Sequence, residues 1–309
     1  MTYCVAMRLD EGLVFLADSR TNAGVDHVST FRKLTVYERP GERMITLMTS
    51  GNLAAGQAVR QLVSETRDAE GISIWNAKSM FEVARVVGDA VRAVRARDAA
   101  ALEDAGLDFT MSIICGGQIK GEQCRLFLIY SAGNFIEALA EAPYFQIGES
   151  KYGKPVLDRM ITPKSTLDEG VKCALVSMDS TMRSNLSVGL PLDLLCYETG
   201  RFAVTRFAMV DANNHYFRMI HDTWGERMKQ IFQEIPAPAW DTSGSLGDVS
   251  TEPTRMAGSQ YRTGSEATLP RAAPLRASLP HDFETEIAPL PPEEIQTLAQ
   301  DADESSQSN

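Results

Sequence analysis

The sequence has few of the residues that bind metals or form disulfides. Its five cysteines are odd in number, scattered along the chain and never arranged as CxxC, which argues against a disulfide framework or a thiolate zinc site. Its four histidines form no HxxxH or HxH pair beside a carboxylate, so no metal site is expected. We expect buried, reduced thiols, no cofactor and a cytoplasmic location.

Positive charge and long apolar runs are also scarce. The formal net charge of −11 argues against a nucleic-acid partner. Apolar runs such as LVFLA and LFLIY are too short to span a membrane, and the first residues lack the basic and apolar regions of a secretory signal. With 44% hydrophobic and 23% charged residues, the composition is typical of a globular protein without a membrane partner.

The composition changes sharply near residue 240. Residues 241–309 contain 12 acidic and 4 basic residues, a net charge of −8, and seven of the 14 prolines. Such a segment buries too little apolar surface to offset the entropy that is lost on folding. We therefore expect one domain over residues 1–240, followed by an acidic tail rich in Pro, Ser and Thr over residues 241–309 that is disordered.

Within residues 1–240 the apolar pattern predicts strands and helices in blocks. Short apolar runs predict strands, and apolar residues spaced three or four apart predict helices. The expected strands are residues 2–9, 12–18, 27–38, 43–51, 108–118, 123–133, 191–198 and 202–210, and the expected helices are 53–63, 76–102, 151–161, 167–183 and 214–233. Blocks of antiparallel strands separated by helix pairs predict an α+β fold in which two sheets face each other and helices cover both outer faces.

One short glycine motif lies between the strands and the later helices. Residues 148–154 read GESKYGK, which fits the G-x4-G-K pattern of a phosphate-binding loop. Pro155 stands where that loop needs a Ser or Thr for magnesium, and it has no backbone N–H for a phosphate. The G-x-S-x-x-G spacing also differs from that of a serine-hydrolase nucleophile turn. We expect neither nucleotide binding nor a Ser-His-Asp triad here.

The first strand begins with a threonine that can act as a nucleophile. Removal of Met1 would leave Thr2 with both a hydroxyl group and a free α-amino group. An α-amine has a pKa of about 7.7–8, so a sizeable fraction is neutral near neutral pH and can accept the hydroxyl proton without a histidine. A nearby cation lowers the pKa of the amine, and a carboxylate can position that cation. Asp18, at the end of the second strand, and Lys33, on the third, are the candidate pair.

Taken singly, these residues are common in ordinary strands and turns, but three longer stretches accompany them. They are ADSRTNAGVDHVSTFRK at residues 17–33, MTSGNLAAGQ at 48–57 and DSTMRSNLSVGLPLDLL at 179–195. Together with Thr2 they resemble Anbu, the bacterial proteasome-like family of the proteasome β-subunit and HslV superfamily, over residues 2–240. The resemblance implies the four-layer αββα sandwich of N-terminal nucleophile hydrolases. It also implies a threonine peptidase that acts by acyl transfer on peptides or unfolded proteins, and a ring-like or open homo-oligomer.

The same resemblance implies roles for single residues. Thr2 matches the nucleophile and its amine the base, Asp18 matches the acidic partner, and Lys33 matches the catalytic lysine. Gly51 matches the glycine whose backbone N–H stabilises the oxyanion. Asn22 falls where proteasomes use a threonine to hydrogen-bond the substrate backbone.

The chain departs from proteasome subunits at the turn from a strand to the third helix. Those subunits carry Gly-Ser-Gly there, and this chain has Gly148-Glu149-Ser150. Either Glu149 replaces the serine or Ser150 serves from a shifted register. A carboxylate beside the amine at this point would raise the pKa of the amine and make it a poorer base at neutral pH.

A second departure concerns the supporting Asp-x-x-Ser pair of proteasome subunits. Asp179 matches the aspartate, but Met182 stands three residues later, so Ser184 or Ser187 is the candidate substitute.

The resemblance also implies partners and leaves two other functions open. Anbu-type genes commonly accompany ATP-grasp and transglutaminase-like proteins, which are therefore candidate partners. A dedicated amidase or transferase for a small peptide would use the same nucleophile. An assembly scaffold would keep the fold and could dispense with the nucleophile.

Overall fold

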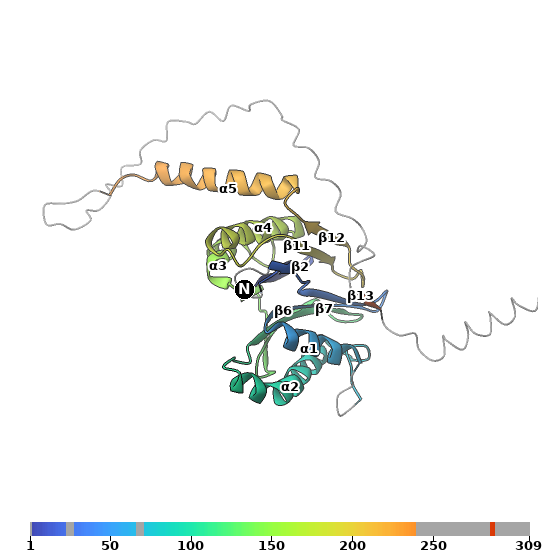
Figure 1. The fold of residues 1–309 in the computed structure, drawn as a ribbon. Coiled ribbons are helices and arrows are strands. Elements are labelled where there is room, and N and C mark those ends of the chain that lie inside the picture. The colour runs from blue at the N-terminus through green and yellow to red at the C-terminus, as the bar shows by residue number, and fades with distance from the viewer. Residues whose placement is uncertain (1, 23–27, 66–70, 239–284, 288–309) are drawn as a thin grey trace, which may run out of the picture. The chain divides into compact units, whose positions relative to one another are not determined.

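The computed structural model describes residues 2–22, 28–65, 71–238 and 285–287 (Figure 1). Residues 2–213 together with 285–287 form one part, and helix α5 (His215–Glu234) belongs to a second, so each part is described by itself. Met1 and most of the predicted tail, residues 241–309, lie outside the described residues, so the disorder of that part of the tail stays a prediction. The described residues of the tail, 285–287, form a short strand, which was not predicted.

The first part has four layers, with two sheets packed face to face between two pairs of helices (Figure 1). One sheet has the order β10-β1-β2-β11-β12, built from β1 (Tyr3–Leu9), β2 (Gly12–Asp18), β10 (Tyr144–Gly148), β11 (Leu192–Glu198) and β12 (Arg206–Val210). The other has the order β13-β5-β6-β7-β8-β9, built from β5 (Leu34–Arg39), β6 (Arg43–Gly51), β7 (Met111–Ile119), β8 (Arg125–Tyr130), β9 (Phe135–Glu137) and β13 (Thr285–Ile287). Strand β13 runs parallel to β5, and the other named pairings are antiparallel.

Helices cover both outer faces of this pair of sheets (Figure 1). Helices α3 (Ser150–Met160) and α4 (Leu167–Ser184) cover the first sheet, and α1 (Leu53–Glu65) and α2 (Met80–Asp104) cover the second. A short hairpin of β3 (Arg20–Asn22) and β4 (Val28–Thr30) stands apart from both sheets. The predicted four-layer αββα sandwich is therefore confirmed.

Apolar side chains fill the layers and explain why the strands read as continuous apolar runs. Between the two sheets, Phe15 of β2, Leu126 of β8 and Leu195 of β11 are fully buried in one cluster. Against the outer face of the second sheet, Val87 of α2 packs with Ile113 of β7 in another. Strands covered on both faces need apolar residues at successive positions, which the sequence supplies.

Two features of the strands differ from the prediction. Residues 27–38 were expected as one strand, but β4 and β5 are separated by Phe31–Lys33, which belong to neither. The backbone N–H of Phe31 donates to the carbonyl of Ser19 at 2.8 Å, which extends the pairing of β4 with β3, so β4 belongs to that hairpin and not to the sheet that contains β5. Strands β3, β9, β10 and β13 were not predicted. Strands β9 and β10 are short and only partly buried and so lack a clear apolar pattern, and β3 and β13 have three residues each.

Helix starts follow local capping. Helix α2 begins at Met80, four residues after the predicted start, because the hydroxyl of Ser79 accepts a hydrogen bond from Glu82 N at 3.1 Å. Helix α4 begins with a capping box between Thr166 and Glu169. In the second part, Asn214 caps α5 by accepting from Phe217 N at 2.9 Å.

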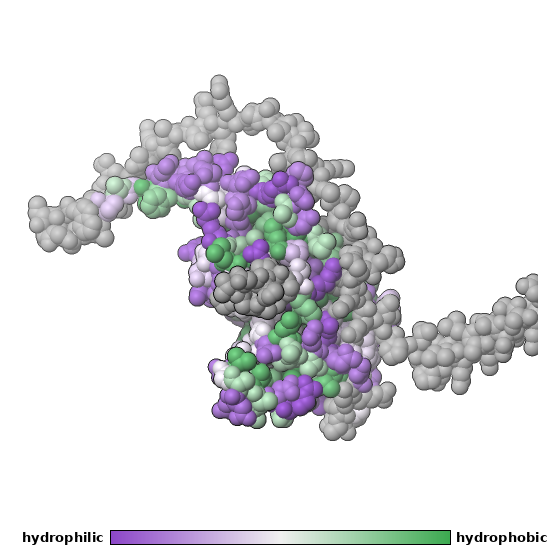
Figure 2. Space-filling view, viewed as in Figure 1, coloured by the Kyte–Doolittle hydropathy of each residue, from purple (hydrophilic) through white to green (hydrophobic). Residues whose placement is uncertain are grey.

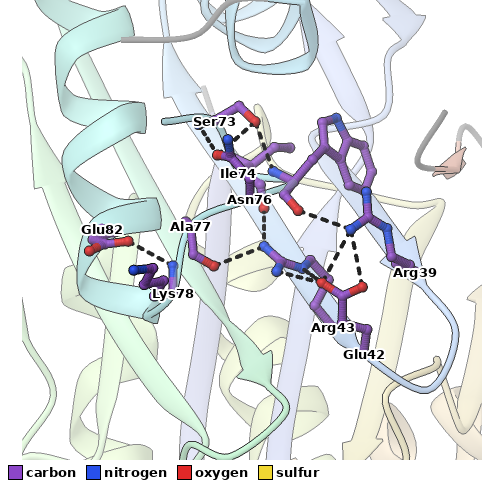
Figure 3. A network of polar contacts seen from close by, with 10 residues as sticks. Arg39, Glu42, Arg43, Ser73, Ile74, Asn76, Ala77, Lys78 and Glu82 are labelled. Atoms are coloured by element: carbon purple, nitrogen blue, oxygen red, sulfur yellow. Dashed lines mark hydrogen bonds and ion pairs between the residues drawn. The ribbon is translucent and has the colours of Figure 1, made fainter. Parts of the chain in front are cut away.

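A polar network fixes the segment that precedes α2 against the β5–β6 hairpin (Figure 3). The guanidinium of Arg43 donates to the carbonyl oxygens of Ile74 at 2.7 Å and Ala77 at 3.1 Å, and it pairs with Glu42 at 2.6 Å. Arg39 donates to the same carboxylate at 3.1 Å. Buried polar groups need such partners, and the network anchors the end of β6 that is farthest from Gly51.

No helix in the described ranges is long and apolar enough to cross a membrane. Helix α5 is amphipathic, and Met228, Ile231, Phe232 and Ile235 at its C-terminal end are exposed. Figure 2 shows hydrophobic residues on the surface at that end of the helix, whose visible face is otherwise largely hydrophilic.

Candidate active site

Thr2 lies just before the N-terminal end of β1, in a cavity of about 610 Å³. The next residue, Tyr3, pairs with Gly148 of β10 and begins the strand, so Thr2 is held at the sheet's end. Gly51, Gly148 and Glu149 line the same cavity. The cavity therefore combines the candidate nucleophile with the end of β6 and the turn before α3.

A buried ion pair lies directly behind Thr2. The Nζ of Lys33 is 2.7 Å from Oδ1 of Asp18 and donates to the carbonyl of Arg20 at 2.8 Å. The same Oδ1 accepts the backbone N–H of Tyr3 at 2.9 Å. Asp18 is fully buried and Lys33 is 6% exposed. The pair is thus attached through one backbone N–H to the residue that follows the nucleophile.

Burial sets the electrostatics of this pair. It raises the pKa of the Asp18 carboxyl above its usual value, while the charge and hydrogen bond of Lys33 and the N–H of Tyr3 act in the opposite direction. Burial also raises the pKa of the neighbouring Cys4 thiol, so Cys4 stays protonated and is not a competing nucleophile. Screening by salt is weak at such buried sites, so the Lys33 charge acts strongly on the groups beside it.

Gly51 ends β6 in a conformation that suits glycine. Its φ is +107°, and a Cβ built there would lie 2.1 Å from the carbonyl oxygen of Thr110. The following residue, Asn52, accepts a hydrogen bond from Ala55 N at 3.1 Å and so starts α1. Any side chain at position 51 would push this strand end away from the cavity that it lines with Thr2.

The turn between β10 and α3 is in direct contact with Thr2. Glu149 N donates to the carbonyl of Thr2 at 2.8 Å. Gly148 has a φ of +80°, and a Cβ there would lie 1.9 Å from the same carbonyl oxygen. Glu149 is among the cavity-lining residues of the described part, and Ser150 is not. Ser150 begins α3, and its carbonyl accepts from the side chain of Gln146 at 3.2 Å.

The remaining candidates lie on β3, on α4 and in the loop that follows α4. Asn22 is on β3 and pairs with Val28, and its side chain is outside the described part of the structure. Asp179 is buried on α4, and Ser184 is the exposed last residue of that helix. Ser187 follows in the next loop, where its N–H donates to Asn185 at 2.9 Å. Asp179, Ser184 and Ser187 are not among the residues found to line the cavity with Thr2 in the described part of the structure.

A family model and several solved structures are similar to this chain. A family model described as proteasome subunit matches residues 2–190. Among solved structures, an Anbu (Gly-1) mutant from Hyphomicrobium sp. strain MC1 is 49% identical, covers 77% of this chain and 99% of its own, and has a TM-score of 0.71. Anbu (ancestral beta-subunit) from Yersinia bercovieri is 49% identical over 77% of this chain and 100% of its own, with a TM-score of 0.71. This chain belongs to the Anbu family.

A third similar Anbu structure is that of a helical assembly. The helical assembly of the Anbu complex from Pseudomonas aeruginosa is 44% identical, covers 77% of this chain and 98% of its own, and has a TM-score of 0.72. A search of curated proteins returned no match. As an Anbu protein, the chain is a proteasome-like member of the N-terminal nucleophile hydrolases.

The geometry of this Anbu protein adds two residues that were not singled out from the sequence. Arg20 lines the cavity, and its guanidinium donates to the carbonyl of Leu186 at 3.1 Å. The hydroxyl of Tyr3, which is buried, lies 2.6 Å from Ser177 Oγ and accepts from Gln146 Nε2 at 2.6 Å. Arg20 stands two residues after Asp18, and that spacing was the one available signal. The Tyr3 contacts connect positions more than 140 residues apart and left no signal in the sequence.

Proposed function

We propose that this Anbu-family protein is a threonine peptidase that uses Thr2 as its N-terminal residue after Met1 has been removed. One observation carries the proposal: the cavity that holds Thr2 and Gly51 is connected, through Tyr3 N, to the buried pair of Asp18 and Lys33. A threonine with its own amine needs no histidine as base.

The reaction is acyl transfer in two steps. The α-amine of Thr2 accepts the proton of its own hydroxyl, directly or through a water, as Oγ attacks the carbonyl carbon of the substrate amide. The developing oxyanion is stabilised at Gly51, and the departing amine takes the proton as the C–N bond breaks. Water then attacks the ester on Thr2 and releases the acyl group as a carboxylic acid.

The two buried charges serve this chemistry without taking part in bond formation. The cation of Lys33 favours the neutral form of the amine, which is the form that accepts a proton. Asp18 fixes Lys33 at 2.7 Å and also holds Tyr3 N, so it orients the base and the nucleophile together. Asn22, on the β3 strand, is proposed to hydrogen-bond the backbone of an extended substrate.

Peptides or unfolded proteins are the proposed substrates. The cavity is large enough for several residues of an extended chain, and the end of β6 that lines it, Ser50–Gly51, extends beyond its pairing with β5, so a peptide backbone can pair there. Folded proteins would not present an amide bond in this extended form.

Self-association is part of the proposal. The Pseudomonas aeruginosa relative is described as a helical assembly. On α5 of this chain, Met228, Ile231, Phe232 and Ile235 are exposed at three- and four-residue spacing, which forms an apolar stripe suited to contacts between copies. We propose a ring-like or open homo-oligomer that functions in the cytoplasm, with ATP-grasp and transglutaminase-like proteins as candidate partners.

Two measurements test the proposed function. The intact mass of the purified protein must lack Met1, because a retained methionine removes the free amine. An epoxyketone directed at N-terminal threonines should then label the wild type and not Thr2→Ala, with the adduct mapped by mass spectrometry. Thr223→Val is the matched control, since Thr223 is exposed on α5, is not among the described residues that line the cavity, and should not affect labelling. Labelling that persists in Thr2→Ala would contradict the assignment, and absence of labelling in the wild type would favour a scaffold.

A further inference from the structure

The turn before α3 is fixed to Thr2 by its main chain. Tyr3 pairs with Gly148, and Glu149 N donates to the carbonyl of Thr2 at 2.8 Å. The approach is so close that a Cβ on Gly148 would lie 1.9 Å from that carbonyl oxygen. The backbone of Glu149 therefore cannot shift relative to Thr2 without breaking this hydrogen bond.

The carboxylate of Glu149 does not cap helix α3, although Glu149 is in the position to do so. Glu149 is the N-cap residue of α3, where an acidic side chain commonly accepts from the first N–H groups of a helix, yet it makes no such bond. Instead it lines the cavity with Thr2, and the side chain is only 13% exposed. A carboxylate that is mostly buried is unfavourable unless a cation or hydrogen-bond donor compensates it.

The cations of the described part nearest to this carboxylate are engaged elsewhere or are weakly held. Lys151 Nζ lies 3.7 Å from Glu149, beyond hydrogen-bonding distance, and is 69% exposed, so water screens its attraction. Arg20 donates to the carbonyl of Leu186. Lys33 is paired with Asp18. Removal of Met1 adds a further positive charge in this cavity, the α-ammonium of Thr2, whose carbonyl is already hydrogen-bonded to Glu149 N.

We propose that Glu149 is the counter-ion of the Thr2 α-amino group and positions that base in the cavity. The inference rests on the proposed function, because it requires Thr2 to be the N-terminal residue. It assigns Glu149 as a positioning residue, which acts on the reaction through the amine.

The arrangement makes the base depend on two opposing charges. Around Thr2, β2 contributes Asp18, the segment before β5 contributes Lys33, β3 contributes Arg20, and the turn before α3 contributes Glu149 with Lys151. The cavity residues contributed by β6 and β7 are uncharged. Lys33 and Arg20 favour the neutral amine, whereas Glu149 favours the ammonium, so that Glu149 moves the onset of activity to higher pH.

The test measures the amine itself and does not depend on peptidase activity. The full chain without Met1 is labelled with a trace of acetic anhydride between about pH 6 and about pH 10, and mass spectrometry of the N-terminal peptide gives the pKa of the α-amine. Glu149→Gln should lower that pKa by about one unit, and Glu149→Asp should keep it closer to the wild-type value. Glu141→Gln removes an exposed carboxylate from the same part of the chain and should leave the pKa unchanged.

The outcomes separate the inference from the function on which it rests. An α-amine with the same pKa in the wild type and in Glu149→Gln overturns the inference, while the epoxyketone experiment on Thr2 is unaffected by that result. Retention of Met1 overturns the proposed function instead. If Glu149→Gln does not fold, Glu149→Ser removes the same charge with a smaller side chain, and the same shift is expected.

Discussion

The ion pair between Asp18 and Lys33 is the place where removal of one charge has the largest expected effect on stability. Asp18 is fully buried, Lys33 is 6% exposed, and their atoms are 2.7 Å apart. Asp18→Asn keeps the shape of the side chain and an oxygen that can accept from Tyr3 N, but it leaves a buried cation without a carboxylate. Breaking one partner of a buried pair costs about 3–5 kcal/mol, so we expect a loss of that size in the free energy of unfolding.

A double mutant separates the charge from the shape. Lys33→Met in the Asp18→Asn background removes the uncompensated cation, and the loss should fall to about 2 kcal/mol or less because no buried charge remains. The free energy of unfolding is measured by urea denaturation with linear extrapolation, followed by circular dichroism. Epoxyketone labelling of Thr2 should be lost in the double mutant, which lacks the Lys33 charge, and reduced in Asp18→Asn, which keeps that charge without the carboxylate that positions it.

Asp158→Asn is the matched control for this experiment. Asp158 also pairs with a lysine, Lys154, at 2.9 Å, but both side chains are about half exposed. Screened surface pairs contribute little, so this substitution should leave the urea midpoint nearly unchanged. The reasoning would be refuted by a loss of free energy of unfolding in Asp18→Asn below about 1 kcal/mol. It would also be refuted if the loss in the double mutant equalled the sum of the losses measured separately in Asp18→Asn and Lys33→Met.

Three other perturbations have defined outcomes. Gly148→Ala forces a Cβ against the carbonyl of Thr2, so it should cost about 1–3 kcal/mol from backbone strain and reduce Thr2 labelling, measured by urea denaturation and mass spectrometry. Tyr3→Phe removes the hydroxyl that lies 2.6 Å from Ser177 Oγ, but Ser177 still donates to the Gly153 carbonyl, so a loss of about 0.5–1.5 kcal/mol should appear in the same urea assay at unchanged fold by circular dichroism. Burial acts to raise the pKa of Glu42, but the hydrogen bonds from its two arginine partners outweigh it and hold that pKa below its ordinary value. The stability from this carboxylate is therefore present above the pKa of an unfolded glutamate, about 4.3, and is lost as the pH falls through the lower folded value, so the difference between wild type and Glu42→Gln should shrink over that acid range in urea titrations.

The sequence predicts the layers of the fold well because their strands are covered on both faces. Runs such as residues 13–17 are apolar at every position, and burial on both sides of the sheet requires that pattern. The break at Phe31–Lys33 could not be predicted in this way. It follows from the hydrogen bond of Phe31 N to the Ser19 carbonyl and from the hydrogen bond of the Lys33 side chain to Asp18. Both are contacts between segments that carry no shared pattern in the chain.

In the candidate site, too, some residues could be predicted from the sequence and others required the structure. Thr2, Asp18 and Lys33 could be chosen from chemistry and resemblance, and the structure brings Asp18 and Lys33 together behind Thr2. The choice between Glu149 and Ser150 needed the turn itself, since one residue of register decides which side chain enters the cavity. The roles of all these residues stay predictions until the labelling experiments are done.

Strand β5 pairs with β6 on one side and with three residues from near the end of the chain, Thr285–Ile287, on the other. An uncovered edge strand offers its N–H and C=O groups to any extended peptide, including segments of other proteins. Because β13 is covalently attached to the same molecule, it competes for that edge at an effective concentration far above that of a free peptide. An extended chain that pairs with this edge of β5 must therefore first displace β13.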